Sequence, residues 1–491
     1  MFIPMPKGCD SNAVTTDPRE AIVRAARTFI VANRLPVEYH AVFGWRTSPG
    51  GLVSALEPAL QGLSAVWVGW RGSPAPEDGR GPHPTRTPYA GNIAVLEIPM
   101  SQWEVSHFYD GICNAAFWPL YHDAVVSPVF RDEEFAVYRR INQRFADCVA
   151  ATAPPGAAVW VHDYQLQLVP AMLRSSRPDL RIGFFLHVPF ASAAEFAALP
   201  WKEEVLDGLL GADLIGFQTQ AAADCFLAEA CRWRPACRDG RSLLLAGEAG
   251  QRRVEVGVFP VGPDAQRFSR LAASPALQDA AARIRADFGA PEQILLGVDR
   301  LDYTKGIDLR IRAVADLLMG DEFAGRDIQY IQVAVPSRSE LSAYRQLRVT
   351  VEETLRAANA RLVARGLRPI HYVNEVLPTE QVAALYAAAD VMLVTSLADG
   401  MNLVSKEFVA CRHRQDGRLV LSTATGAAGQ LRDAWLVDPC DGADLRRGIG
   451  AAMRASADDA RMRMTRLRAA VFEADARQWA QSFLARLHDT P

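Results

Sequence analysis

The feature that most constrains this chain is a series of short, almost unbroken apolar runs separated by longer amphipathic stretches. Runs such as Ala158–His162, Ile328–Val335 and Val391–Thr395 are rich in Val, Ile, Leu and aromatic residues and do not alternate with polar ones. This pattern is typical of parallel strands that are buried on both faces, and such strands are joined by crossover helices. The alternation of strands and helices therefore predicts doubly wound α/β sheets.

The expected strands fall into two series, separated by the Pro- and Gly-containing string Phe259–Asp264, which indicates a hinge. A single hydrophobic core stops growing near ~250–300 residues, so a chain of 491 residues needs at least two. We expect two Rossmann-like domains facing across a cleft, with ligands beyond the carboxyl ends of the strands. The other expected strands are Thr28–Ala32, Ala65–Val68, Ile93–Ile98, Ile182–His187, Leu214–Phe217, Ile294–Val298, His371–Val373 and Leu419–Ser422, and the expected helices include Glu134–Ala151, Gly306–Met319, Glu340–Arg365 and Asn402–Cys411.

Charge and composition exclude several classes of protein. The net charge of -3 argues against a nucleic-acid binder that works by bulk electrostatics. No uncharged apolar run reaches the ~18 residues of a membrane span. Met1–Val14 lacks the apolar segment that a secretory signal would contain. The eight cysteines form no C-x-x-C pair, which argues against a zinc site or a disulfide scaffold. We expect reduced thiols in a cytoplasmic protein, with a homo-oligomer left open.

Two cations stand where a strand runs into a helix in the second half of the chain. Arg300 and Lys305 follow the apolar run that begins at Ile294, at the carboxyl end where such a domain binds its ligand. Two cations beside a helix N-terminus can hold a diphosphate without a metal. The alternative is that they form structural ion pairs with Asp299 and Asp302, and spacing alone does not choose between the two.

A second turn from strand to helix contains Asp399-Gly-Met-Asn402. Its backbone N–H groups could bind an anion or sugar hydroxyls, and Glu407 lies in the helix that follows. A carboxylate there can accept two hydrogen bonds from a ribose diol. The alternative interpretation is an ordinary helix start capped by Asp and Gly.

Polar groups also follow the strands of the first half. His162-Asp163-Tyr164 ends one strand and His187 ends another, so both groups face the same edge of the sheet. Arg34 follows the first strand in the same way, and Gly50-Gly51 offers a loop where a backbone can approach a ligand closely. Aromatic residues such as Trp70 and Trp118 suit either a hydrophobic core or the face of a pyranose ring.

Several motifs are missing from the sequence. There is no H-E-x-x-H, no phosphate-binding G-x-x-x-x-G-K-[ST], no G-x-S-x-G and no metal-holding D-x-D. A leaving phosphate would therefore have to be stabilised by protein cations, and we expect neither a metal nor a cofactor. The loop Arg71–Pro88 is rich in Pro and Gly and carries three arginines, so it is either a surface loop or a lid over an anionic ligand.

These motifs together resemble the trehalose-6-phosphate synthases of glycosyltransferase family 20, in order and over more than nine-tenths of the chain. The resemblance implies a GT-B fold and metal-independent, retaining transfer of glucose from a nucleotide diphosphate glucose to glucose 6-phosphate. Its domains would be 1–262 for the acceptor, 263–458 for the nucleotide sugar, and helices in 459–491 that cross back to the first domain. The most specific strings are Arg300-Leu-Asp-Tyr-Thr-Lys-Gly306, Asp399-Gly-Met-Asn-Leu-Val-Ser-Lys-Glu407, His162-Asp-Tyr164, His187-Val-Pro-Phe190 and Phe117-Trp-Pro-Leu-Tyr-His122.

The resemblance also implies roles for the donor side. Arg300 and Lys305 would hold the donor diphosphate, Glu407 would hold the ribose, and His187 and Asp163 would contact the transferred glucose. Apart from Glu407, these are our candidate catalytic residues. The residues that would line the donor are Gly51, Asp399, Gly400, Met401, Asn402, Leu403 and Val404.

On the acceptor side, Arg34, Tyr109, Trp118 and Arg338 would hold the phosphate and the sugar, with Trp70 beside them. The partners implied are therefore a nucleotide sugar and a sugar phosphate. Other functions that share the fold are a glucosylglycerol-phosphate synthase, a pseudo-glycosyltransferase that joins cyclitols, and a regulatory protein that binds sugar phosphate without catalysis.

The sequence departs from the family's usual pattern in three places. Ala398 stands where Arg usually precedes Asp-Gly-Met-Asn, which bears on donor affinity. Gln430 replaces the usual Glu of a Gly-Ala-Ala-x-Glu-Leu string, and about 27 residues precede the first expected strand.

Overall fold

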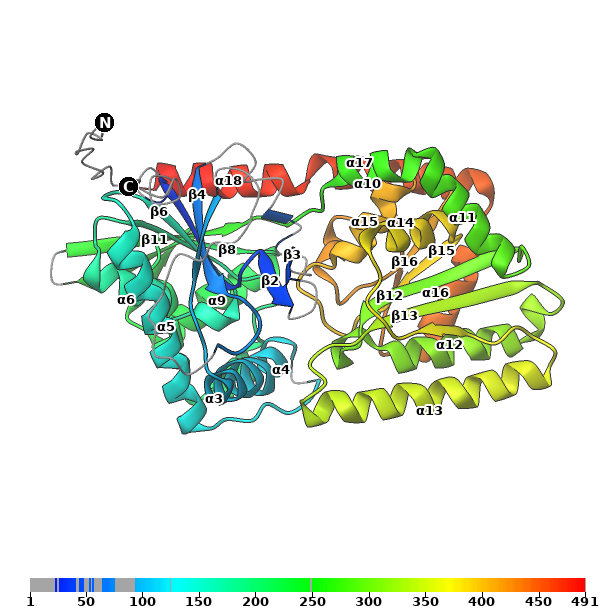
Figure 1. Cartoon of the computed structure of the whole chain (residues 1–491), viewed down its shortest axis with the longest axis horizontal. Coiled ribbons are helices and arrows are strands. Elements are labelled where there is room, and N and C mark those ends of the chain that lie inside the picture. The colour runs from blue at the N-terminus through cyan, green and yellow to red at the C-terminus, as the bar shows by residue number, and fades with distance from the viewer. Residues whose placement is uncertain are drawn as a thin grey trace, which may run out of the picture.

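The apolar runs form two separate parallel sheets, one in each half of the chain (Figure 1). The structure is a computed structural model and describes residues 23, 26–40, 44–47, 53, 55–56, 64–75, 93–123, 125–247 and 250–490. The first sheet has nine strands in the order β5-β4-β1-β6-β7-β8-β11-β10-β9. The second has six, all parallel, in the order β14-β13-β12-β15-β16-β17. These sheets confirm the predicted pair of Rossmann-like domains.

The strands of the first half are β1 (Thr28–Arg34), β2 (Val37–His40), β3 (Gly44–Thr47), β4 (Ala65–Trp70), β5 (Ile93–Glu97), β6 (Ala158–His162), β7 (Arg181–Phe185), β8 (Leu214–Phe217), β9 (Ala236–Asp239), β10 (Ser242–Gly247) and β11 (Gly250–Val258). Its helices are α3 (Gln102–Glu104), a π-helix (Val105–Phe117), α4 (Trp118–Tyr121), α5 (Asp132–Thr152), a 3-10 turn (Tyr164–Leu166), α6 (Val169–Ser176), α7 (Ala193–Ala198), α8 (Lys202–Leu210) and α9 (Gln220–Trp233).

The strands of the second half are β12 (Gln293–Arg300), β13 (Ile328–Val335), β14 (His371–Val373), β15 (Val391–Val394), β16 (Arg418–Ser422) and β17 (Trp435–Val437). Its helices are α10 (Ala265–Ala273), α11 (Pro275–Asp287), α12 (Ile307–Met319), α13 (Ser342–Ala364), α14 (Thr379–Ala388), α15 (Leu403–Cys411), α16 (Gly442–Arg454), α17 (Ala457–Glu473) and α18 (Ala476–Asp489), with 3-10 turns at Tyr303–Lys305, Asp321–Phe323 and Gly426–Gly429.

Burial explains why the strand sequences lack polar alternation. Phe29 and Val31 of β1 pack in one hydrophobic core, whereas Ile30 and Ala32 point to the other face and pack in a second core. Both faces of the sheet are therefore apolar, as parallel strands between helices require.

All the strands and helices that the sequence predicts are present, with ends that differ by up to two residues. The sequence analysis did not predict the antiparallel edge formed by β9, β10 and β11, the hairpin of β2 and β3, or the short β17. β11 lies next to the antiparallel strands β10 and β9, and it begins Gly-Gln-Arg-Arg because only part of its surface is buried. Apolar runs therefore identify most of the parallel strands, including β5 and β14 at the edges, but not the antiparallel part of the first sheet.

The last helix returns to the first half of the molecule, and Figure 1 shows α18 in red along the first sheet. Phe483 of α18 stacks on Trp160 of β6 with ring centroids 4.4 Å apart. A side chain at Gly183 in β7 would lie within 2.7 Å of Phe483, so the helix rests directly on the sheet. The two chain crossings meet where Ala476 N–H donates to the Pro263 carbonyl at 3.1 Å.

Candidate functional site

The turn after β12 brings two acidic residues and two basic residues together. Asp302 accepts a hydrogen bond from the Thr304 N–H at 3.1 Å, and Gly306 adopts a left-handed conformation (φ 59°) that lets α12 begin at once. Asp299 is buried and pairs with Arg310 of α12. The predicted alternative, in which Arg300 and Lys305 form ion pairs with Asp299 and Asp302, is therefore wrong for Asp299.

Arg300 and Lys305 differ in how they are held. The Arg300 guanidinium lies 4.0 Å from the Asp302 carboxylate, and the Arg300 side chain is 46% exposed. Most of its N–H groups can therefore donate to a ligand. The Lys305 ammonium is largely buried and lies 2.5 Å from an Asp399 carboxylate oxygen. Lys305 therefore links the turn after β12 to the turn after β15.

Asp399 is the centre of the second turn. Its carboxylate accepts hydrogen bonds from Asn402 at 3.0 Å and from Ser396 at 3.3 Å, in addition to the Lys305 ammonium. Burial alone would raise the pKa of Asp399, but Lys305 and Asn402 hold it below its usual value. Asp399 therefore stays ionised and already has three partners.

The same turn contacts the first half of the chain. A side chain at Gly400 would lie 2.3 Å from the His187 carbonyl oxygen, so only glycine permits this approach. Asn402 adopts a left-handed conformation (φ 81°) and caps α15 by accepting from the Ser405 N–H at 2.8 Å. Met401 is buried, whereas Leu403 and Val404 are partly exposed in the first turn of α15.

Glu407 lies one turn into α15 and is partly exposed. The Tyr386 hydroxyl donates to one of its carboxylate oxygens at 3.1 Å. Burial raises the pKa of Glu407 to about 7, although the hydrogen bond from Tyr386 acts in the opposite direction. This carboxyl therefore changes its protonation state near neutral pH.

Asp163 and His187 come together at the carboxyl ends of β6 and β7. Asp163 has a positive φ of 72° and accepts from the His187 backbone N–H at 3.1 Å. Burial raises the pKa of Asp163 to about 6 and lowers that of His187 to about 3. The His187 ring is therefore neutral, and its Nε2 lies 3.1 Å from Nδ1 of His162.

The predicted acceptor residues form a cluster of arginines on aromatic rings. The Arg34 guanidinium lies over Trp70 at 4.4 Å and over Tyr109 at 5.3 Å. Trp118, at the start of α4, has Arg338 at 4.0 Å and Arg300 at 5.3 Å from its ring centroid. The structure thus places all five predicted acceptor residues and one predicted donor residue in two stacks, one on Trp70 and Tyr109 and one on Trp118.

The charges of this cluster act on one phenol. Burial alone would raise the pKa of Tyr109, but Arg338, Arg34 and Arg300 together lower it. Three cations, from β1, from β12 and from the loop after β13, therefore act on one hydroxyl group. Such a group of cations attracts anions.

Arg338 has a second role that the sequence did not reveal. It is almost buried, has a positive φ of 48°, and pairs with the fully buried Asp302 at 3.2 Å. It also donates to the hydroxyls of Tyr344 and, from the first half of the chain, Tyr164 at 3.3 Å. The His162-Asp-Tyr164 string was a signal for Tyr164, but nothing in the spacing of Asp302 and Tyr344 indicates that they hold Arg338.

Some predicted positions lie outside the described residues. These are Gly51 with its neighbour Gly50, and the part of the Arg71–Pro88 loop beyond residue 75. Ala398 is buried beside the turn after β12. Among the described residues, no group of His, Cys, Asp and Glu side chains could hold a metal ion, and no helix is long and apolar enough to cross a membrane.

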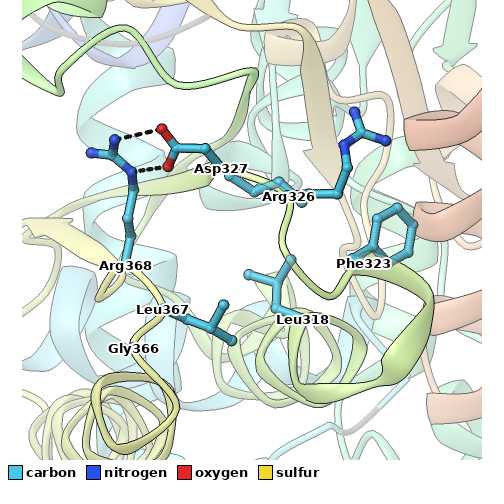
Figure 2. A pocket seen from close by; sticks show the side chains of 8 residues that line it. Leu318, Phe323, Arg326, Asp327, Gly366, Leu367 and Arg368 are labelled. Atoms are coloured by element: carbon cyan, nitrogen blue, oxygen red, sulfur yellow. Dashed lines mark hydrogen bonds and ion pairs between the residues drawn. The ribbon is translucent and has the colours of Figure 1, made fainter.

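A cavity in the second half lies away from this cluster (Figure 2). It occupies about 60 Å³ between Leu318, Phe323 and Leu367, near the start of β13. Ligands of parallel sheets bind at the opposite, carboxyl end of the strands, and Arg368 at its rim is paired with Asp327. We do not assign it to the site.

Comparisons with known proteins support one family. The model of the family described as "Glycosyltransferase family 20" matches residues 20–489. A trehalose-6-phosphate synthase from Mycolicibacterium gilvum is 43% identical over 468 residues, which cover 93% of each chain. The solved structure of an alpha,alpha-trehalose-phosphate synthase (UDP-forming) from Burkholderia xenovorans, in complex with glucose-6-phosphate, superimposes with a TM-score of 0.86 at 27% identity, over 94% of this chain and 100% of that one. The E. coli trehalose-6-phosphate protein bound with UDP-2-fluoro glucose gives a TM-score of 0.85 at 29% identity, over 94% of this chain and 99% of that one.

Proposed function

The chain belongs to glycosyltransferase family 20, and we propose that it transfers glucose, with retention, from UDP-glucose to glucose 6-phosphate, giving trehalose 6-phosphate and UDP. The observation that carries this proposal is the pair of cation groups at the facing strand ends. Lys305 and Arg300 suit a diphosphate, whereas Arg34 and Arg338 suit a second, separate phosphate. Relatives at this level of similarity carry the same activity in their names.

On the donor side, we assign Lys305 and Arg300 to the diphosphate of UDP-glucose. The charge on the leaving phosphate grows in the transition state, so cations fixed beforehand lower the barrier. The amide groups at the start of α15 would add N–H donors, from the run Gly400, Met401, Asn402, Leu403 and Val404. Glu407 would accept the ribose hydroxyls through its carboxylate. Gly51 lies outside the described residues, and its role beside the donor stays a prediction.

On the acceptor side, we assign the phosphate of glucose 6-phosphate to Arg34 and Arg338. Trp70 and Tyr109 hold the Arg34 guanidinium in place through their ring faces, and Trp118 does the same for Arg338. Because Arg34 is the last residue of β1 and Arg338 follows β13, a phosphate bound by both would join the two domains.

The carboxylates near the site favour front-face transfer over a covalent glycosyl-enzyme. The Asp399 carboxylate already accepts hydrogen bonds from Lys305, Asn402 and Ser396. The Asp163 carboxylate accepts one from the His187 backbone N–H. In the proposed step, the bond from the anomeric carbon to the UDP oxygen breaks on the face where the acceptor hydroxyl attacks. The hydroxyl proton passes to the departing phosphate oxygen, so no protein base is needed. Asp163 and His187 would then bind hydroxyls of the transferred glucose.

The test is product analysis with purified enzyme, UDP-glucose and a panel of acceptors. We expect α,α-configured trehalose 6-phosphate from glucose 6-phosphate, and no comparable product from glycerol 3-phosphate or a cyclitol phosphate. An inverted anomeric product or a trapped glycosyl-Asp163 would contradict the mechanism. UDP binding without product release would instead support a regulatory binding protein.

We also propose that the enzyme needs no metal ion and works in the reducing cytoplasm. The support for the first is the pair of cations at the proposed diphosphate site, which can replace a metal. The support for the second is that the cysteines of the described residues are free thiols.

A further inference from the structure

We propose that His162, which is fully buried, is a positioning residue that fixes the tautomer of His187, so that His187 presents a ring N–H to the donor glucose. The inference rests on the proposed function, because it concerns the same donor site. It goes further by assigning a role to His162 and a hydrogen-bonding polarity to His187.

The two imidazoles are adjacent because their strands are adjacent. His162 is the last residue of β6 and pairs with Phe185 of β7 in parallel register, and His187 follows two residues later. His162 Nδ1 and His187 Nε2 are 3.1 Å apart, which is a hydrogen-bond distance. One of these nitrogens therefore carries a proton and the other offers a lone pair.

Both rings are neutral. His162 is enclosed by apolar and aromatic side chains, with Trp160 at 4.5 Å and Trp479 of α18 at 6.4 Å between ring centroids. His187 contacts Phe185 and Trp479 in the same way, at 4.7 and 5.8 Å. Burial disfavours the charged form and lowers the pKa of both imidazoles. Each ring therefore has one N–H and one lone pair.

The surroundings of the other His162 nitrogen indicate which tautomer is present. His162 Nε2 is buried and has no hydrogen-bond partner in the structure. The indole N–H groups of Trp160 and Trp479, in the same cluster, also have no acceptor. A buried N–H without an acceptor is rarer than an unpaired acceptor. A proton on His162 Nε2 would add a third unpaired donor to this cluster, whereas a lone pair would not.

The tautomer of His162 determines the tautomer of His187. With its proton on Nδ1, His162 donates to the lone pair of His187 Nε2. His187 must then carry its own proton on Nδ1, the ring nitrogen that His162 does not engage. His187 is only partly buried, so this N–H is available to a hydroxyl oxygen of the donor sugar. The reverse tautomer would offer that oxygen a lone pair instead.

The direct test is the 15N NMR spectrum of histidine-labelled full-length enzyme, with resonances assigned from the His162→Phe and His187→Phe variants. We expect His187 to show a protonated Nδ1 and an unprotonated Nε2 at pH 7, with and without UDP. A protonated His187 Nε2 would overturn the proposal. This readout does not depend on activity, so it stands or falls separately from the proposed function.

Kinetics provide a second test with a matched pair of variants. His162→Gln keeps an N–H that can donate to His187 Nε2, whereas His162→Leu cannot donate. We expect His162→Leu to lower kcat by about tenfold or more, with an unchanged KM for glucose 6-phosphate, and His162→Gln to recover most of the loss. Equal losses in two variants with the wild-type Tm would contradict the positioning role. Should His162→Leu fail to fold, the spectrum of the wild-type enzyme still decides.

Discussion

Replacing Arg34 or Arg338 with alanine should separate a residue that only binds the acceptor from one that also stabilises the fold. Arg34 is partly exposed and rests on the rings of Trp70 and Tyr109, and no ion pair with it is found among the described residues. Arg338 is nearly buried and neutralises the fully buried Asp302. Both changes should reduce the preference for glucose 6-phosphate, but only the second should destabilise the protein.

The magnitudes follow from these contacts. Each charge-assisted hydrogen bond to phosphate is worth roughly 1.5–3 kcal/mol, so Arg34→Ala should lower kcat/KM for glucose 6-phosphate about 10- to 150-fold. The exposed contact with the aromatic rings is worth about 0.5–1 kcal/mol, so Tm should change by only a few degrees. Removing one partner of a buried ion pair costs about 3–5 kcal/mol, which should lower Tm by roughly 6–20 °C for Arg338→Ala.

The assay is initial-rate kinetics on glucose 6-phosphate and glucose, with Tm and UDP affinity measured for each variant. UDP binding should change little in Arg34→Ala, because the residues proposed to hold UDP, namely Arg300, Lys305 and Glu407, all belong to the other domain. The variant Arg338→Ala with Asp302→Asn should regain stability without regaining the preference for the phosphorylated acceptor. If Arg34→Ala kept the wild-type ratio of kcat/KM between the two acceptors, the assignment of the acceptor phosphate would be wrong.

Three further predictions concern metal and pH. Activity after exhaustive EDTA treatment should stay within about twofold, and a loss that Mg²⁺ or Mn²⁺ restores would contradict metal independence. The affinity for UDP, measured by calorimetry, should weaken as pH falls from 8 to 6, because the Glu407 carboxyl, with its pKa of about 7, loses its charge. Glu407→Gln should reduce this dependence to the part that comes from protonation of the UDP phosphate itself, whose second pKa is about 6. Burial lowers the pKa of Lys406 from 10.5 to about 7. Between pH 7 and 10.5, Lys406 is therefore neutral in the native state but still protonated in the unfolded chain. The free energy of unfolding should consequently rise with pH by up to about 1.4 kcal/mol per pH unit. The amide oxygen of Gln430 lies 2.6 Å from Lys406 Nζ. Gln430→Glu would place a carboxylate there and keep Lys406 protonated, so Tm measured at pH 7, 8 and 9 should rise less than in the wild type.

The central strands were predictable because strands that are buried on both faces consist almost entirely of apolar residues. Ile328–Val335 has the same bounds in the sequence pattern and in the structure. The antiparallel edge was not predictable in this way, because β11 alternates polar and apolar residues and reads as a surface segment. Its register depends on pairing with β8, a partner distant in sequence.

The part of the proposed site that could be predicted consists of residues at the carboxyl ends of strands. Parallel topology alone places Asp163 beside His187, and Arg300 near the turn that contains Asp399. It does not determine which acid pairs with which base. Asp299 could not be assigned to Arg310 from spacing, since the pairing depends on how α12 packs on β12. Arg338 was predicted as a ligand for phosphate, whereas its contact with Asp302 depends on backbone geometry at a positive φ.

The return of α18 to the first sheet has a consequence for the order in which the protein is made. Trp160, Phe185 and Gly216 are synthesised long before Phe483, the side chain that packs against them. Until then, the part of the sheet that α18 covers presents aromatic side chains to water. The first domain therefore receives α18 only after every strand of the second sheet has been synthesised. A nascent chain stalled before Ala476 would expose the rings of Trp160 and Phe185, even though the strands of both described sheets have already been synthesised.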